Sequence, residues 1–193
     1  MPKLLVLFQS RRPDVVELAE AAVEGARRVR FAEVDLRRLA DPDETSVPAS
    51  TNAAGGREYR TLEHVDDLIA YDGLILVVCA VSEASAALAR TIGSHGATLT
   101  DKVGSALTPA TDADRNSVLW SALTPMADHG MILVPAPFAD ANDPAETARR
   151  LGTRVAEVIG WVTHARSHHH HEQPRHEQPR RHDHHDDHRH DHH

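Results

Sequence analysis

The chain has 193 residues, with 29 acidic and 21 basic side chains and a formal net charge of -8. This length suits one domain of roughly 150 to 170 residues plus an appendage, and the acidic balance excludes a general nucleic-acid binder, which needs a basic face. The single cysteine, Cys79, excludes an internal disulfide. No apolar run approaches the ~20 residues of a membrane helix, so we expect a cytoplasmic protein without a membrane span.

The chain opens with a predicted strand, turn and helix. Residues 3–8 are an apolar run too short for a buried helix, and after the loop at 9–12 the apolar residues recur at helical spacing up to Ala26. In an open parallel sheet, ligands bind outside the carboxyl ends of the strands, where this loop meets a helix N-terminus that attracts anions. The chemistry of this loop therefore decides most of the functional argument.

The middle of the chain contains the strongest strand signal. Residues 31–36 alternate in polarity and predict a second strand near an edge, followed by a long irregular connection over 37–60. A short helix is expected over 61–70. The run 72–79 is apolar without alternation, which is typical of a central parallel strand covered on both faces.

The last third alternates in the same way. We expect a helix over 82–92, a strand over 103–107, and a helix over 114–128 that Pro125 kinks or ends early. A fifth strand follows over 131–135. Asp143 then begins the last predicted helix as its N-cap, and this helix runs to about His164.

Five strands alternating with five helices predict a doubly wound α/β domain. Right-handed crossovers place the strands in one parallel sheet with helices on both faces. We predict a three-layer domain over residues 1–166 with the strand order 2-1-3-4-5.

Three segments carry a resemblance to a known family: Val-Glu-Gly-Ala-Arg-Arg-Val at 23–29, Tyr-Asp-Gly at 71–73, and Ala-Asp-His-Gly-Met-Ile-Leu-Val-Pro at 127–135. Across residues 3–164 the chain resembles the WrbA-type NAD(P)H:quinone oxidoreductases of the flavodoxin superfamily. The resemblance implies a flavodoxin-like fold, a homo-oligomer, bound FMN, and transfer of two electrons from NAD(P)H to a quinone. It also implies that His129 lies close to the quinone.

The same resemblance implies three FMN-binding loops, each altered here. The positions that match are Ser10, Arg11, Arg12, Ala80, Thr108 and Thr111. In the first loop Pro13 removes an amide donor, and Asp14 places a carboxylate where it can cap the helix and repel a phosphate. The second loop replaces the family's glycine-threonine-proline-threonine, and the third has lost its glycines. We therefore predict weakened or lost FMN binding, unless Arg11 and Arg12 hold the phosphate instead.

Two further side chains have alternative interpretations. His129 either donates a hydrogen bond to a substrate carbonyl or caps the turn before the fifth strand. Cys79 is either a reactive thiol near the crevice or a buried small hydrophobic residue, which is the commoner case.

The C-terminal tail, residues 167–193, holds 12 of the 16 histidines and repeats His-Glu-Gln-Pro-Arg at 171 and 176. It lacks apolar residues apart from two prolines, so we expect it to be disordered. Its interleaved aspartates and the repeat argue against a purification tag. Imidazoles favour Ni, Zn, Cu or Co, and the tail either binds such a transition metal or only solubilises the chain. The candidate metal ligands are His168, His169, His170, His171, His176, His182, His184, His185, His188, His190, His192 and His193.

Two functions follow from these observations. In the first, the chain is an FMN-dependent quinone reductase, or a descendant of one with impaired FMN binding. In the second, the α/β domain is a non-catalytic module for self-association, and the tail buffers or delivers a metal.

Overall fold

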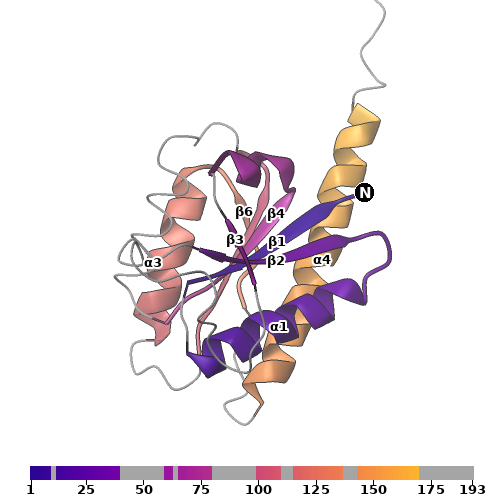
Figure 1. Ribbon diagram of the computed structural model, residues 1–193. Helices are drawn as coiled ribbons and strands as arrows, with labels where there is room; N and C mark the ends of the chain where they lie inside the picture. The colour runs from indigo at the N-terminus through magenta and orange to yellow at the C-terminus, as the bar shows by residue number, and fades with distance from the viewer. Residues whose placement is uncertain are drawn as a thin grey trace, which may run out of the picture.

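A computed structural model describes residues 1–9, 12–39, 59–62, 65–79, 99–109, 115–136 and 143–169 (Figure 1). The elements, in chain order, are β1 (Lys3–Phe8), α1 (Pro13–Arg27), β2 (Glu33–Leu39), β3 (Arg60–Leu62), the 3-10 helix η2 (Val65–Ala70), β4 (Gly73–Val77), β5 (Val103–Leu107), α3 (Arg115–Asp128), β6 (Ile132–Leu133) and α4 (Pro144–His169).

The sheet is parallel throughout, with the order β3-β2-β1-β4-β5-β6. The predicted order 2-1-3-4-5 is confirmed for β2, β1, β4, β5 and β6, and β3 adds a sixth strand outside β2. Val6 of the central strand β1 lies between Leu36 of β2 and Ile75 of β4.

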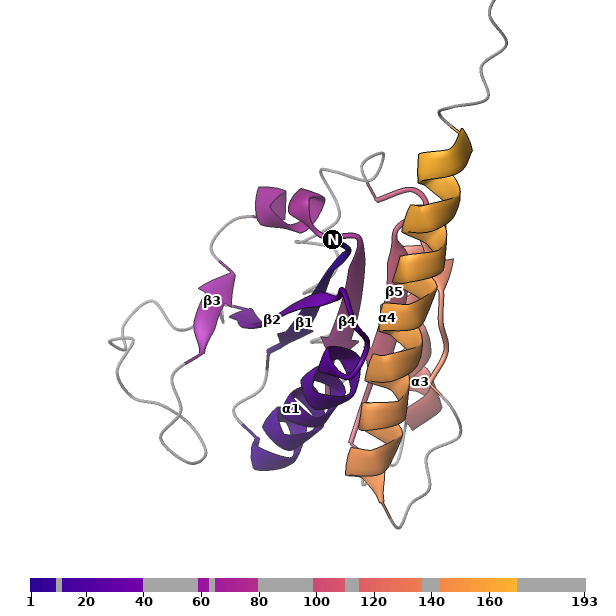
Figure 2. The same ribbon diagram turned by 90° about the vertical axis from the view of Figure 1, so that its right-hand side faces the viewer.

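Helices cover both faces of the sheet, as predicted. Figures 1 and 2 show α1 and α4 on one face and α3 on the other. Because side chains alternate along a strand, Val6 and Phe8 of β1 pack with α1 and α4, whereas Leu5 and Leu7 pack with η2 and α3. Both faces of β4 are covered in this way, which explains why its residues are apolar without interruption.

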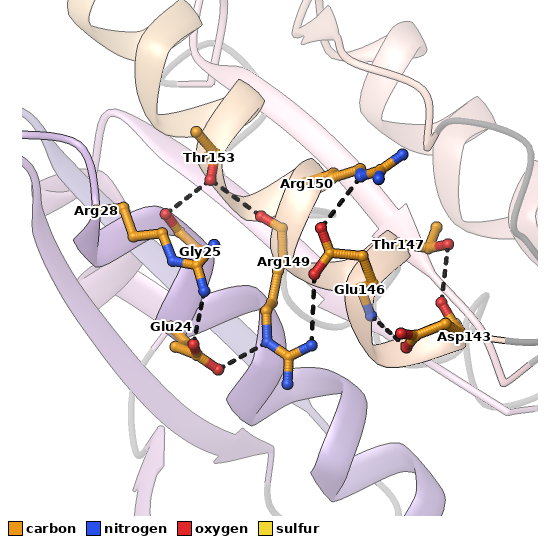
Figure 3. A network of polar contacts seen from close by, with 9 residues as sticks. All are labelled: Glu24, Gly25, Arg28, Asp143, Glu146, Thr147, Arg149, Arg150 and Thr153. Atoms are coloured by element: carbon orange, nitrogen blue, oxygen red, sulfur yellow. Dashed lines mark hydrogen bonds and ion pairs between the residues drawn. The ribbon is translucent and has the colours of Figure 1, made fainter.

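The helices α1 and α4 cross with their backbones in contact. A Cβ added at Gly25 would overlap the carbonyl oxygen of Arg149, and one added at Gly152 would overlap that of Ala22. The Thr153 hydroxyl donates to the Gly25 carbonyl at 2.9 Å (Figure 3). Only glycine permits this approach, so these two positions set how closely the helices pack.

Charged side chains surround the crossing. Arg149 donates to Glu24 at 2.8 Å, and Arg28 donates to the same carboxylate at 2.8 Å (Figure 3). The guanidinium of Arg149 lowers the pKa of Glu24 and is the largest cause of that shift. At the start of α4, Asp143 accepts from the backbone N–H of Glu146 at 2.8 Å, so the predicted N-cap is confirmed.

One predicted element assignment is wrong. The helix expected over 61–70 is a strand followed by a 3-10 helix, because Arg60–Leu62 pair with Arg37–Leu39 of β2. The helix predicted over 114–128 is confirmed as α3, and of the two effects predicted for Pro125 the early end is excluded, because the helix continues to Asp128. Its hydrogen bonding resumes after the proline, since the N–H of His129 donates to the Pro125 carbonyl at 3.2 Å.

Several boundaries also differ from the predictions. The strand β2 runs over Glu33–Leu39, and α4 extends to His169 rather than about His164, three residues into the predicted tail. The predicted helix over 82–92, most of the 37–60 connection and residues 170–193 lie outside the described residues.

Candidate functional site

The candidate site is the crevice at the carboxyl ends of the strands, where an open α/β sheet binds its ligands. The central strands β1 and β4 pair in register, as do β4 and β5, so their ends lie side by side. Gln9, Cys79 and Thr108 directly follow or lie just beyond these ends. Thr108 is buried, and Cys79 is partly buried.

The N-terminus of α1 faces this crevice with its own carboxylate already in place. Asp14 accepts two hydrogen bonds from the Arg12 guanidinium, at 3.1 Å and 2.6 Å. It also accepts from the backbone N–H of Val15 at 3.0 Å. The hydrogen bond from Arg12 is the largest cause that holds the pKa of Asp14 below its usual value, so the carboxylate is ionised at neutral pH.

The other backbone groups of the first helical turn are committed as well. Pro13 has no N–H, and the N–H of Val16 donates to the Arg12 carbonyl at 3.2 Å. Arg12, which was predicted as a residue that could hold the FMN phosphate in place of the backbone amides, forms an ion pair with Asp14 in this structure. A phosphate at this helix end would need donors, and the described donors are engaged within the chain.

Gln9 is a residue that the sequence did not single out. Its Oε1 atom is buried and has no hydrogen-bond partner among the described residues. A buried acceptor without a donor costs about 1–3 kcal/mol, which makes it a place where a ligand's donor would bind. The feature of the sequence that could have identified Gln9 is its position directly after the first strand. An acceptor here suits an N–H or O–H group and not a phosphate oxygen.

Tyr59 closes the α1 side of the site and was also missed. Its ring meets Phe8 edge to face, with centroids 5.1 Å apart and an interplanar angle of 89°. Its hydroxyl donates to Glu20 of α1 at 2.7 Å. The sequence placed Tyr59 at the end of an irregular connection, where no periodic pattern marks it.

His129 lies at the amino ends of the strands, on the side of the sheet opposite to these residues. It follows α3 and precedes β6, next to Gly130, whose carbonyl accepts from the N–H of Asp101 at the amino end of β5. Within one chain, Gln9, Arg12 and Thr108 therefore lie at the carboxyl ends of the strands, and His129 lies at the amino ends.

The remaining predicted site residues are not described. Ser10, Arg11, Ala80 and Thr111 lie outside the described residues, as do the tail histidines from His170 onward. His168 and His169 form the end of α4. Within the described ranges, no group of three or more His, Cys, Asp or Glu side chains could hold a metal ion. None of the described helices is long and apolar enough to cross a membrane.

Comparison of sequences shows similarity to known proteins over part of the chain. No protein-family model matches the chain. An NAD(P)H dehydrogenase (quinone) from Acidithiobacillus ferrooxidans is 42% identical over 79 residues, which cover 39% of this chain and 37% of that protein. The match thus spans little more than a third of the relative's length.

Solved structures resemble the chain over most of its length. An archaeal flavodoxin superimposes with a TM-score of 0.54 and 13% identity over 82% of this chain and 99% of its own. A diflavin flavoprotein A3 from Nostoc sp. gives 0.54 and 15% over 88% and 98%. A flavone reductase gives 0.56 and 15% over 84% and 65%. At these identities the likeness establishes the fold.

The sequence match and the structural neighbours agree with the resemblance drawn from residues 3–164. The chain therefore has a flavodoxin-like α/β fold, and over 79 residues it is similar to an NAD(P)H dehydrogenase (quinone).

Proposed function

We propose that the chain is a homo-oligomeric protein of the NAD(P)H:quinone oxidoreductase lineage in which FMN binding is weakened or lost. The observation that carries this proposal is the Asp14 carboxylate, which occupies the N-terminus of α1 and is held there by Arg12 and the N–H of Val15. The described residues therefore do not fit the phosphate end of FMN.

The physical argument is electrostatic. A second anion about 4 Å from Asp14 would meet a repulsion of ~1 kcal/mol per charge pair in bulk water and ~4 kcal/mol near a protein surface. Arg12 can turn to a phosphate only by leaving Asp14, which exposes that repulsion fully. The helix dipole favours one anion at this end, and the chain supplies that anion itself.

Titration of FMN fluorescence tests the proposal with Asp14→Asn, which keeps the side-chain shape and removes the charge. We expect FMN to bind this variant at least ~10-fold more tightly than the wild-type chain, from the repulsion removed. Asp128→Asn is the matched control. Asp128 is exposed at the end of α3, and its substitution changes the net charge equally without touching the crevice. Wild-type protein that retains FMN through dialysis would contradict the proposal.

The reaction class is tested in the same variant. When bound, FMN supplies hydride transfer between NAD(P)H and a quinone. We expect NAD(P)H-dependent reduction of a simple benzoquinone to rise in Asp14→Asn with added FMN, in step with FMN occupancy. Activity that does not follow occupancy would separate quinone reduction from the flavin.

A second function is favoured by the composition of the tail, where 12 histidines follow Ser167. We propose that the tail binds a transition metal of the Ni, Zn, Cu or Co class. Its protonation near the ordinary imidazole pKa of ~6.5 would release the metal on mild acidification.

Calorimetric titration with each metal would compare the full chain with a variant that ends at Ser167. This variant keeps the Ser167 hydroxyl bond to the His164 carbonyl and the Arg166 contacts with Asp101. We expect metal binding in the full chain and its loss in the shorter one. Equal stoichiometry in both would exclude the tail as the binding segment.

A further inference from the structure

A groove of about 430 Å³ lies near the amino ends of the strands, opposite the candidate site. The turn between α1 and β2 forms one wall, including Phe31, and the last turns of α4 form the other. On α4 the lining side includes Glu157, Gly160, Trp161 and His164. These four positions have the spacing i, i+3, i+4 and i+7, so they share one face of the helix.

Two aromatic side chains at this groove are exposed. Phe31 is 74% exposed and Trp161 is 68% exposed. Phe31 also has a φ of 75°, a left-handed conformation that is unusual for a bulky residue and is strained. Large exposed aromatics of this kind are enriched where proteins bind one another.

Gly160 has no structural explanation within the described chain. No atom of the described residues lies within 4 Å of a Cβ built there, whereas Gly25 and Gly152 each admit the backbone of a crossing helix. A glycine inside a helix is less favourable than alanine, so it usually serves a close approach. At Gly160 the described chain supplies no such group, so the position is open to a group from outside it.

The end of α4 is held in position for such a contact. The Arg166 guanidinium donates to the Asp101 carbonyl at 2.6 Å, and its Nη2 atom lies 3.6 Å from the Asp101 carboxylate. Ile159 and the partly buried Val162 pack toward the core from the other side of the helix. The face that carries Trp161 is therefore presented outward on an anchored helix.

We infer that this face is an interface between two copies of the chain, which cross through their α4 helices in antiparallel orientation. A two-fold axis between Gly160 and Trp161 would seat the indole of each copy over Gly160 of the other. The same axis would bring Glu157 of each copy opposite His164 of the other. The stripe is thus complementary to itself, which is the requirement for a two-fold contact.

This interface concerns the homo-oligomer proposed above and does not depend on FMN. Sedimentation of the full chain over a dilution series in EDTA, which removes metal bridging by the tail, should show a dimer that dissociates on dilution. We expect Trp161→Glu and Gly160→Leu each to raise the dissociation constant at least ~10-fold, as for residues at the centre of an interface. Circular dichroism should show both variants folded, because both positions face open space.

Trp120→Glu is the matched control, because Trp120 is 64% exposed on α3 at the other face of the sheet. It should leave the dissociation constant unchanged. The chain has two tryptophans, so Trp120→Phe isolates the fluorescence of Trp161, whose emission should shift to the blue as concentration rises. A monomeric wild-type chain, or a dimer that Trp161→Glu and Gly160→Leu leave intact, would overturn the inference.

Discussion

Single side chains at both edges of the sheet show how the chain uses polar groups where strands end. At the carboxyl edge, Asp14 satisfies Arg12 and the first turn of α1. Near the other end of β2, the Tyr71 hydroxyl donates to Asp35 at 2.5 Å, and Arg37 lies over the Tyr71 ring, 5.8 Å from its centroid. In each case a charge that could serve a ligand is instead paired within the chain.

The titration of Tyr71 gives a prediction at this scale. Burial, followed by the hydrogen bond to Asp35, raises the pKa of Tyr71 to about 12. The phenol ionises near ~10 in the unfolded chain. The neutral Tyr71 side chain therefore contributes fully to stability below that pH, and its contribution is lost as the pH rises toward the folded-state pKa. We expect the free energy of unfolding to fall by on the order of 2 kcal/mol over this window.

Denaturant unfolding at several alkaline pH values, compared between the wild-type chain and Tyr71→Phe, measures this contribution. The wild-type chain should lose stability over the window, and Tyr71→Phe should lose less. Identical pH profiles would show that Tyr71 is not responsible.

At the scale of elements, the crossing of α1 and α4 determines the packing on one face of the sheet. Gly25 and Gly152 let the two backbones touch, and Thr153 bridges them through the Gly25 carbonyl. The ion pairs of Glu24 with Arg28 and Arg149 surround this contact but are exposed. Exposed pairs contribute about 0–1 kcal/mol, so close packing rather than charge holds the helices together.

Gly25→Ala tests this conclusion. The added methyl group would overlap the Arg149 carbonyl, and overpacking of this kind costs about 1–3 kcal/mol. Denaturant unfolding would measure the loss. Gly160→Ala is the control at a protein concentration where the chain is monomeric. It should hold or raise stability by about 0.5–1 kcal/mol, because alanine is the better helix former. Equal effects of both substitutions would contradict a special role for the crossing.

At the scale of the whole molecule, the carboxyl ends and the amino ends of the strands carry different side chains. The carboxyl edge carries Gln9, Arg12 with Asp14, and Thr108, and it is the edge where flavodoxin-like proteins bind ligands. The amino edge carries Phe31 and Trp161 at the groove beside α4. The proposed flavin defect and the proposed dimer are therefore separable, and each can fail without the other.

Residues 168–193 contain no apolar residue except two prolines, and this gives a prediction for the domain as a unit. A chain that ends at Ser167 should unfold at the same denaturant midpoint as the full chain when both are monomeric and free of metal. A lower midpoint would mean that residues beyond Ser167 contribute to folding.

The sequence by itself determined the alternation of strands and helices and the cap at Asp143, because hydrophobic periodicity and capping are local patterns. The general rules for such an alternation then predicted the parallel sheet and the order of its five expected strands. The sequence also placed Asp14 in the first turn of α1. It missed β3 and predicted a helix in its place, since a three-residue edge strand depends on pairing with Arg37–Leu39 rather than on its own pattern.

Only the tertiary structure showed that Arg12 is bound to Asp14, that Gln9 has a buried acceptor without a described partner, and that His129 lies at the far edge. It alone distinguished Gly160, where no described residue lies within 4 Å of an added Cβ, from Gly25, where an added Cβ would meet the backbone of α4. The physical reason is the same in each case. These properties belong to pairs of segments distant in the chain, and no local pattern encodes which atoms the fold brings within contact.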